Sequence, residues 1–149
     1  MILAKDIMTR EVITTGEETP ISEAARLMTE NHISGLPVLN KGQALVGIVC
    51  ESDIIDQGKQ LHLPTVVNLM GNIVFLESGK KLEKELKKMA GLTCRDIMSA
   101  PVKTVAPEST LEEIATLMAE NNIHSIPVVA EGKLVGIVGK KDIVRAVAR

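Results

Sequence analysis

Two kinds of hydrophobic pattern alternate along this chain, and both occur twice in the same order. One kind places apolar residues at the i, i+3, i+4 and i+7 positions of a helical face, at Ile21, Ala24, Ala25 and Met28 and again at Leu111, Ile114, Ala115 and Met118. The other kind is a run that is apolar throughout, at residues 44–50 and 134–138, which is typical of a strand covered on both faces. The chain therefore predicts the same set of elements twice.

Direct comparison of the two halves shows a tandem duplication. Asp6-Ile7-Met8 recurs as Asp96-Ile97-Met98, and the five residues of 45–49 recur unchanged at 134–138. A single extra residue near Ala44 is the only gap that the alignment needs. Agreement of this kind does not arise by chance, so we interpret the chain as two copies of one unit.

Each copy predicts a β-α-β-β-α unit. An extended stretch at residues 12–15 or 102–105 leads into a helix, two strands follow around a turn, and a second helix begins near Asp53 or Asp142. One such unit buries too little apolar surface to be stable alone. We therefore expect an α/β (α+β) fold in which the two units pack on each other about a pseudo-two-fold axis.

The starts of the first helices carry recognisable capping residues. In the first copy, Thr19 is expected at the N-cap with Pro20 at the first helical position. In the second copy, Ser109 and Glu112 have the spacing of a capping box.

A segment of different composition separates the copies. Leu82, Leu86 and Met89 lie at helical spacing among many charged residues, which predicts an amphipathic helix. We assign residues 1–60 to the first unit, 61–94 to an ordered connector and 95–149 to the second unit.

The composition excludes several classes of function. The chain has 149 residues, of which 45% are hydrophobic and 24% charged, and its net charge of −2 gives no basic surface for nucleic acid or an anionic membrane. Phe75 is the only aromatic residue, so aromatic platforms for base stacking are absent. With no membrane-length apolar run, no signal peptide and two widely separated cysteines, we expect a cytoplasmic protein.

The sequence contains no pattern that predicts catalysis or a metal site. The three histidines form no metal-ligand spacing, and there is no catalytic triad order, nucleophile elbow or glycine-rich phosphate loop. We therefore expect no enzymatic activity. Gly47 and Gly136 lie inside predicted strands, where the usual reason for glycine is a close approach of another segment.

The order of motifs resembles the CBS (cystathionine-β-synthase) domain. The matching residues are Asp-Ile-Met, then a helix, then residues 34–38 (Ser-Gly-Leu-Pro-Val), then Gly-Ile-Val at 47–49 followed by Asp53. Two copies in one chain resemble a stand-alone tandem pair, called a Bateman module. The resemblance implies a regulatory protein, commonly a homodimer, that requires no cofactor. Its ligand would be AMP, ADP, ATP or S-adenosylmethionine, and it would act on an unidentified regulated protein.

The resemblance also implies where such a ligand binds. The adenine would lie between two equivalent strand starts, with Ile13 and Lys103 approaching it from the other side. These strand starts are Ser34, Gly35, Leu36 and Pro37 in the first copy and His124, Ser125, Ile126 and Pro127 in the second. An apolar slot with backbone donors and acceptors suits a purine. The alternative is that Leu36 and Ile126 belong only to the core.

Asp53 and Asp142 match the family aspartate that accepts hydrogen bonds from ribose hydroxyls, a task that suits an ionised carboxylate. The alternative is a carboxylate that bonds only the start of its own helix. Three residues earlier the family usually has Thr or Ser, whereas this chain has Cys50 and Gly139. The missing hydroxyl favours weaker binding or a different ligand, or an interaction and dimerisation module with vestigial pockets.

Charge distinguishes the two copies at this point. Lys140 and Lys141 precede Asp142 at a helix start, where a phosphate is favoured, whereas the equivalent residues are Glu51 and Ser52. The sequence therefore predicts unequal sites, with the Asp142 half better suited to a phosphorylated ligand. The alternative is that both lysines are simply solvated.

Overall fold

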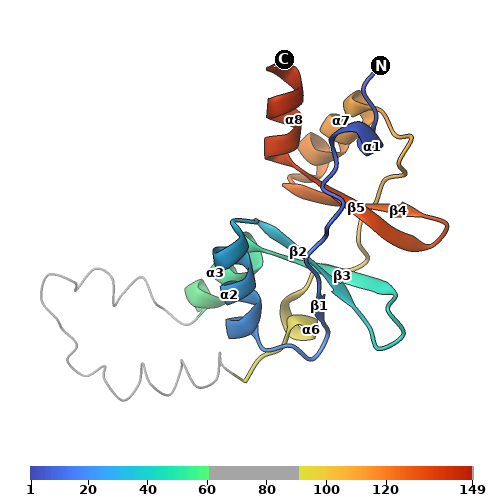
Figure 1. Cartoon of the computed structure of the whole chain (residues 1–149). Coiled ribbons are helices and arrows are strands. Elements are labelled where there is room, and N and C mark those ends of the chain that lie inside the picture. The colour runs from blue at the N-terminus through green and yellow to red at the C-terminus, as the bar shows by residue number, and fades with distance from the viewer. Residues whose placement is uncertain (61–90, 149) are drawn as a thin grey trace, which may run out of the picture.

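The structure of the chain is a computed structural model that describes residues 1–60 and 91–148, without the side chains of residues 58–60. Each repeat contributes an antiparallel pair of strands with a helix before it and a helix after it (Figure 1). The elements of the first repeat are β1 (Thr15–Gly16), α2 (Ile21–Asn31), β2 (Gly35–Leu39), β3 (Leu45–Cys50) and α3 (Glu51–Gln60). Those of the second repeat are α7 (Leu111–Asn121), β4 (Ser125–Ala130), β5 (Lys133–Gly139) and α8 (Lys140–Val147).

The expected β-α-β-β-α order is present, but the first strand of each unit is much shorter than predicted. In the first repeat only Thr15 and Gly16 pair, in parallel with β2. In the second repeat the strand is reduced to one parallel bridge between Val105 and Val128. These stretches have only a single neighbouring strand to bond, and so most of their residues stay outside the sheet. The predicted connector helix lies outside the described residues.

Two short helices exchange places between the repeats. Helix α1 (Ala4–Ile7) is the first element of the first repeat but contacts β5 and α8 of the second, beside which it lies in Figure 1. The Ala4 amide donates to the Ser109 carbonyl at 2.8 Å, and the Thr9 amide donates to the Ile137 carbonyl at 2.9 Å. The N-terminal segment therefore completes the second half of the molecule.

Helix α6 (Cys94–Ile97) makes the reciprocal contacts in the first half, where it lies against β3 and α3. The Cys94 amide donates to the Thr19 carbonyl at 2.8 Å, and the Ser99 amide donates to the Ile48 carbonyl at 2.9 Å. These are the repeat-equivalent bonds of those made by Ala4 and Thr9, as a pseudo-two-fold arrangement requires. Each packed half thus includes the first short helix of the other repeat.

Two hydrophobic cores follow from this exchange. The first contains Ile21, Ala24, Met28, Leu36, Val38, Val49, Cys94 and Ile97, and the second contains Ala4, Val105, Ile114, Met118, Ile126, Val128 and Val138. The predicted helical stripes are confirmed at five of these positions, while Ala25, Leu111 and Ala115 are half-buried.

Gly47 and Gly136 show the close approach that their position in strands predicts. A Cβ atom on Gly136 would overlap the Met8 side chain, and one on Gly47 would overlap Met98. The methionine of each Asp-Ile-Met motif therefore lies on the glycine of the opposite repeat.

The N-caps of α2 and α7 lie one residue after the positions that the sequence predicts. Helix α2 begins at Ile21 after Pro20 as N-cap, and the Thr19 hydroxyl instead accepts from the Gly16 amide at 3.1 Å. In α7 the capping box is formed by Thr110 and Glu113, whose amide donates to the Thr110 hydroxyl oxygen at 3.1 Å. The reason is that the hydroxyls one residue earlier bond the preceding turns instead, as Ser109 does with the Ala106 amide.

Candidate functional site

The starts of β2 and β4 meet where the two halves of the molecule join. The hydroxyl oxygens of Ser34 and Ser125 lie 3.3 Å apart. A Cβ atom on Gly35 would come within 2.8 Å of the Ser125 side chain, so glycine permits this approach. Three of the residues that sequence analysis selected are thus brought together from opposite repeats.

The end of the second strand and the start of the second helix lie next to this junction in each half. Gly35 pairs with Cys50, and Ser125 pairs with Gly139. The Glu51 amide donates to the Ser34 carbonyl at 3.1 Å; in the second half, the Lys140 amide donates to the His124 carbonyl at 3.0 Å. The predicted polar residues of each repeat therefore form one local group.

Asp53 and Asp142 bond the starts of their own helices. The Cys50 amide donates to Asp53 Oδ2 at 2.7 Å, and the Gly139 amide donates to Asp142 Oδ2 at 2.8 Å. This is the capping role that the sequence offered as an alternative. It occupies one oxygen of each carboxylate, so the role toward a ribose stays a prediction.

The surroundings of the two aspartates differ in charge. Burial raises the pKa of Asp53, Asp56 raises it further, and hydrogen bonds from the Cys50 amide and the Ser99 side chain lower it. At the position equivalent to Asp56 the second half has Arg145, whose guanidinium lies 3.7 Å from Asp142 Oδ1. The first half therefore surrounds its aspartate with negative charge and the second half with positive charge.

Cys50 stands where the resemblance to CBS domains leads one to expect Thr or Ser. Burial raises the pKa of its thiol to about 11, and the nearby charges of Asp53 and Glu51 act in the same direction. The thiol is therefore protonated at neutral pH and is a weak nucleophile.

The apolar members of the predicted site are core residues. Leu36 and Ile126 are completely buried, each in the core of its own half, and Pro37 and Pro127 are also fully buried. Ile13 packs against the first core, whereas Lys103 is exposed. Among the described contacts, none joins Lys103 to the group at the junction, so its approach to a ligand stays a prediction.

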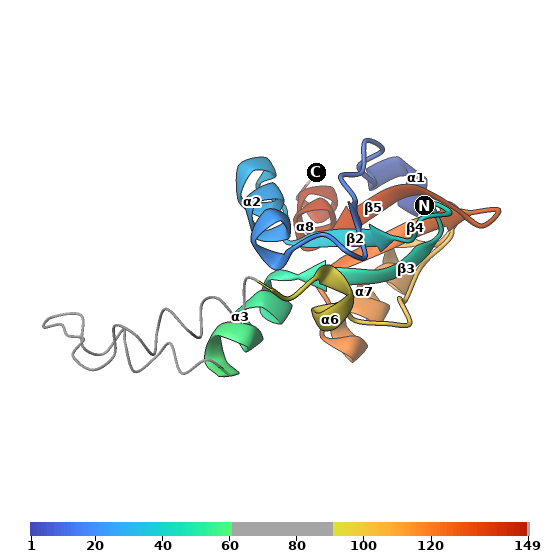
Figure 2. The same cartoon turned by 90° about the horizontal axis from the view of Figure 1, so that it is seen from below.

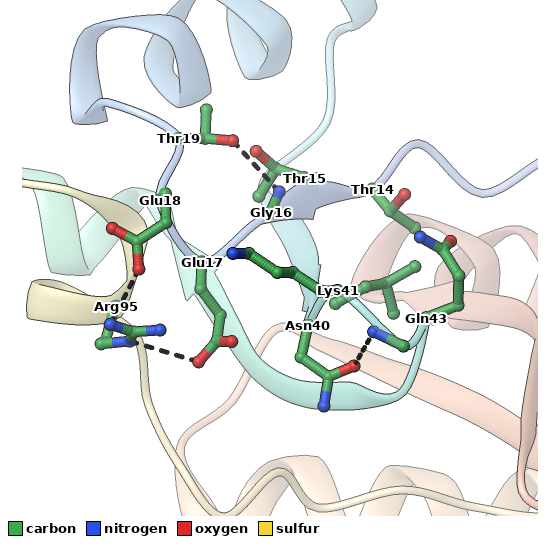
Figure 3. Close-up of a pocket in the computed structure, with 12 residues that line it drawn as sticks. Thr14, Thr15, Gly16, Glu17, Glu18, Thr19, Asn40, Lys41, Gln43 and Arg95 are labelled. Carbon is green, nitrogen blue, oxygen red and sulfur yellow. Dashed lines mark hydrogen bonds and ion pairs between the residues drawn. The ribbon is translucent and has the colours of Figure 1, made fainter.

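A separate open groove of about 960 Å³ lies at the far end of β2 (Figure 3). It is lined by residues 14–19, residues 39–43 and Arg95, none of them among the predicted site residues. Arg95 spans one side of it with ion pairs to Glu17 at 3.3 Å and Glu18 at 2.8 Å. These pairs connect α6 to the loop before α2.

Sequence reasoning missed Ser99, which reaches Asp53 only because α6 crosses to the first half. A usable signal was present, because a hydroxyl residue follows Asp-Ile-Met in both copies, as Thr9 and as Ser99. Within the described residues, no group of three His, Cys, Asp or Glu side chains could hold a metal ion. No helix in the same part of the chain is both long and apolar enough to cross a membrane.

Comparisons with known proteins agree with a duplicated α+β protein of this architecture. The family model of the CBS domain matches residues 4–59 and again residues 94–149. The chain therefore belongs to the CBS domain family, and it carries the domain twice.

The relatives include both uncharacterised and ligand-bound proteins. The uncharacterised protein MJ1426 of Methanocaldococcus jannaschii is 36% identical over 98% of this chain and 91% of its own length. Other curated relatives are longer, and the chain spans 23%, 31% and 56% of three of them.

Two similar solved structures contain adenosine compounds. CBSX2, a CBS-pair protein of Arabidopsis thaliana solved in complex with AMP, is 26% identical over 99% of this chain and 97% of its own, with a TM-score of 0.73. The CBS domain pair of protein MJ0100, solved with 5'-methylthioadenosine and S-adenosyl-L-methionine, is also 26% identical over the same shares, with a TM-score of 0.72.

Proposed function

We propose that this chain is a non-catalytic regulatory protein that binds an adenosine-containing ligand, AMP, ADP, ATP or S-adenosylmethionine, between its two halves. The observation that supports this most is the convergence of Ser34, Gly35 and Ser125 at the junction, beside the helix starts that hold Asp53 and Asp142. The junction offers backbone groups and hydroxyls, and each half places one carboxylate at the helix start beside it. Such a set suits a purine nucleoside better than a reacting substrate, because it includes no activated nucleophile.

Ligand-induced stabilisation tests this proposal. A ligand that binds the native state raises its melting temperature, so we expect a shift with at least one of AMP, ADP, ATP and S-adenosylmethionine at millimolar concentration. Inosine tests whether the adenine base is required, and free phosphate tests whether negative charge alone is enough. If none of the adenosine compounds shifts the melting temperature, the proposed ligand class is wrong.

A second candidate is an interaction and dimerisation module whose ligand pockets are vestigial. Cys50 and Gly139 favour it, because neither residue can offer a ligand the hydroxyl that the family usually places there. This candidate predicts association with itself or a partner, together with no response to any adenosine compound.

If ligands bind, we expect the two halves to be unequal. Lys140, Lys141 and Arg145 surround Asp142, whereas Glu51 and Asp56 surround Asp53. The Asp142 half is the better site for a phosphorylated ligand, and Asp142→Ala should weaken AMP binding more than Asp53→Ala does. If isothermal titration shows that both variants lose the same AMP affinity, the proposed inequality of the two halves is wrong.

We also propose a cytoplasmic homodimer that acts on another protein. Only a ligand that binds one conformation better than another can shift such an assembly between states. The two halves share the exchanged segments, so a ligand at their junction can bias both halves together.

A further inference from the structure

The groove at the far end of β2 is separate from the junction between the two halves. Its volume of about 960 Å³ lies within the range of small-molecule sites, roughly 300–1,000 Å³. In two perpendicular views the tip of the β2–β3 hairpin is on the side away from α3 (Figures 1 and 2). The groove is therefore at the opposite end of the sheet from the helix start that holds Asp53, and a ligand in it would leave the proposed adenosine site open.

One wall of the groove carries an excess of negative charge. Glu17 and Glu18 share a single guanidinium, that of Arg95, so two carboxylates face one cation. The backbone of this wall is fixed as well, because the Arg95 amide donates to the Glu17 carbonyl at 3.0 Å and the Gly16 amide donates to the Thr19 hydroxyl oxygen at 3.1 Å. The wall therefore presents one unbalanced carboxylate charge in a defined place.

The opposite wall presents a positive charge. In Figure 3 the Lys41 side chain extends from the hairpin turn toward the loop that carries Glu17. None of the ion pairs within the described part of the chain includes Lys41. The turn that presents it is held by Asn40 Oδ1, which accepts the amides of Gly42 at 2.8 Å and Ala44 at 3.0 Å. The two walls thus face each other with opposite charges across an open space.

This charge pattern is not required by the fold. The second repeat forms the equivalent hairpin and loop without it. There the residues equivalent to Gly16, Glu17, Asn40 and Lys41 are Ala106, Pro107, Ala130 and Glu131. Polar loop residues that the fold does not need are typical of a binding site.

We propose that this groove binds a free α-amino acid, with its carboxylate at Lys41 and its ammonium group between Glu17 and Glu18. Both contacts are then charge-assisted hydrogen bonds. A simple anion would meet the excess carboxylate charge, and a simple cation would meet Lys41, so each is disfavoured at one wall. Only a ligand that carries both charges satisfies both walls.

Nuclear magnetic resonance of the isotopically labelled full chain tests the proposal, with L-alanine as the probe. Gly16 and Gly42 line the groove, and their amide resonances should shift saturably. Gly132 is the repeat equivalent of Gly42 and should stay in place. Acetate and methylammonium each carry one of the two charges, and we expect both to bind about fivefold more weakly than alanine or less tightly still.

Neutralising either wall should weaken alanine binding. We expect Lys41→Gln and Glu18→Gln each to lower the affinity by about fivefold, since each removes the charge that one end of the ligand contacts. Lys133→Gln on the second hairpin and Glu108→Gln at the equivalent of Glu18 are the matched controls. They make the same changes in net charge and should leave binding unchanged, while the spectra verify that every variant is folded.

Three results would overturn the amino-acid site. The first is the absence of a saturable shift at Gly16 and Gly42 with tens of millimolar alanine. The second is equally tight binding of acetate or methylammonium, which would make the groove a site for a single charge. The third is an equal loss of affinity in the test and control variants. None of these results bears on the adenosine proposal, whose residues lie outside the groove.

Discussion

The resemblance to CBS domains implies a Thr or Ser where this chain has Cys50 and Gly139, and the backbone at Gly139 would accept such a side chain. Gly139 has the extended conformation of an N-cap residue, with φ of −107°. An added Cβ would meet neighbouring atoms at 3.7 Å or more, which is ordinary contact. Position 139 can therefore hold the missing side chain without strain.

Restoring the hydroxyl should strengthen ligand binding. We expect Cys50→Thr and Gly139→Thr to tighten AMP binding by about fivefold each, because one hydrogen bond contributes about 1 kcal/mol. Cys50→Val is the control with a similar shape and no hydroxyl. Isothermal titration that finds Thr and Val equivalent at position 50 would contradict a role for the hydroxyl.

Asp53 should make the free energy of unfolding decrease as pH rises, the opposite of what most aspartates do. Its pKa is raised by burial, so the folded state holds the proton more tightly than the unfolded state. Stability contributed by this proton is present below the ordinary aspartate pKa and is lost as pH rises through the raised folded value. Asp53→Asn should remove this loss and raise the melting temperature at pH 7.

Asp142→Asn is the matched control, because Asp142 lies near the positive charge of Arg145 rather than near Asp56. It should lower the melting temperature at pH 7 or leave it unchanged. A rise of equal size in both variants would show that the charge environment of Asp53 is not the cause.

Residues whose roles are local could be predicted from the sequence, whereas those that depend on the exchange could not. The bonds of Asp53 and Asp142 to their own helix starts follow from a three-residue spacing alone. Ser99 acts on Asp53 from far along the chain, and nothing in the spacing of the chain indicates which half α6 joins. Leu36 could be assigned to a pocket or to the core from sequence, and the structure shows that it is buried in the core.

Among the elements, the crossing of α1 and α6 depends on two glycine–methionine contacts. Gly136→Ala should destabilise the protein by about 1–3 kcal/mol, because the added methyl group would overlap Met8. Met8→Ala removes the obstacle, so in that background the cost of Gly136→Ala should be much smaller. Chemical denaturation of the four proteins in this double-mutant cycle measures the coupling.

Met98 provides the control for this cycle, since it contacts Gly47 and not Gly136. In the Met98→Ala background, Gly136→Ala should keep its full cost. Rescue by Met98→Ala instead of Met8→Ala would mean that each short helix packs on its own repeat.

The central elements were predicted well because their signals are strong and local. The apolar runs at 44–50 and 134–138 became β3 and β5 within one residue at each end, and the 3.6-residue stripes became α2 and α7. The lengths of the first strands were overestimated, because a stretch at the sheet edge pairs only where the neighbouring strand extends alongside it. The exchange of α1 and α6 escaped prediction because the two repeats offer nearly identical docking surfaces.

Considered as one molecule, the protein is a duplicated scaffold whose two halves share segments and differ in charge. The shared segments explain why neither repeat is a self-contained unit. The charge difference gives the junction one acidic and one basic neighbourhood. Both features would let a ligand at the junction act on the arrangement of the whole chain.

Isothermal titration of AMP into the full chain tests the central claim most directly, with the double variant Asp53→Ala and Asp142→Ala as comparison. We expect saturable binding to the wild-type chain and its loss in the double variant, whose folding is verified by its melting curve. Absence of binding to the wild-type chain at millimolar AMP, ADP, ATP and S-adenosylmethionine would contradict the claim. Unchanged binding in the double variant would show that any ligand lies away from these aspartates.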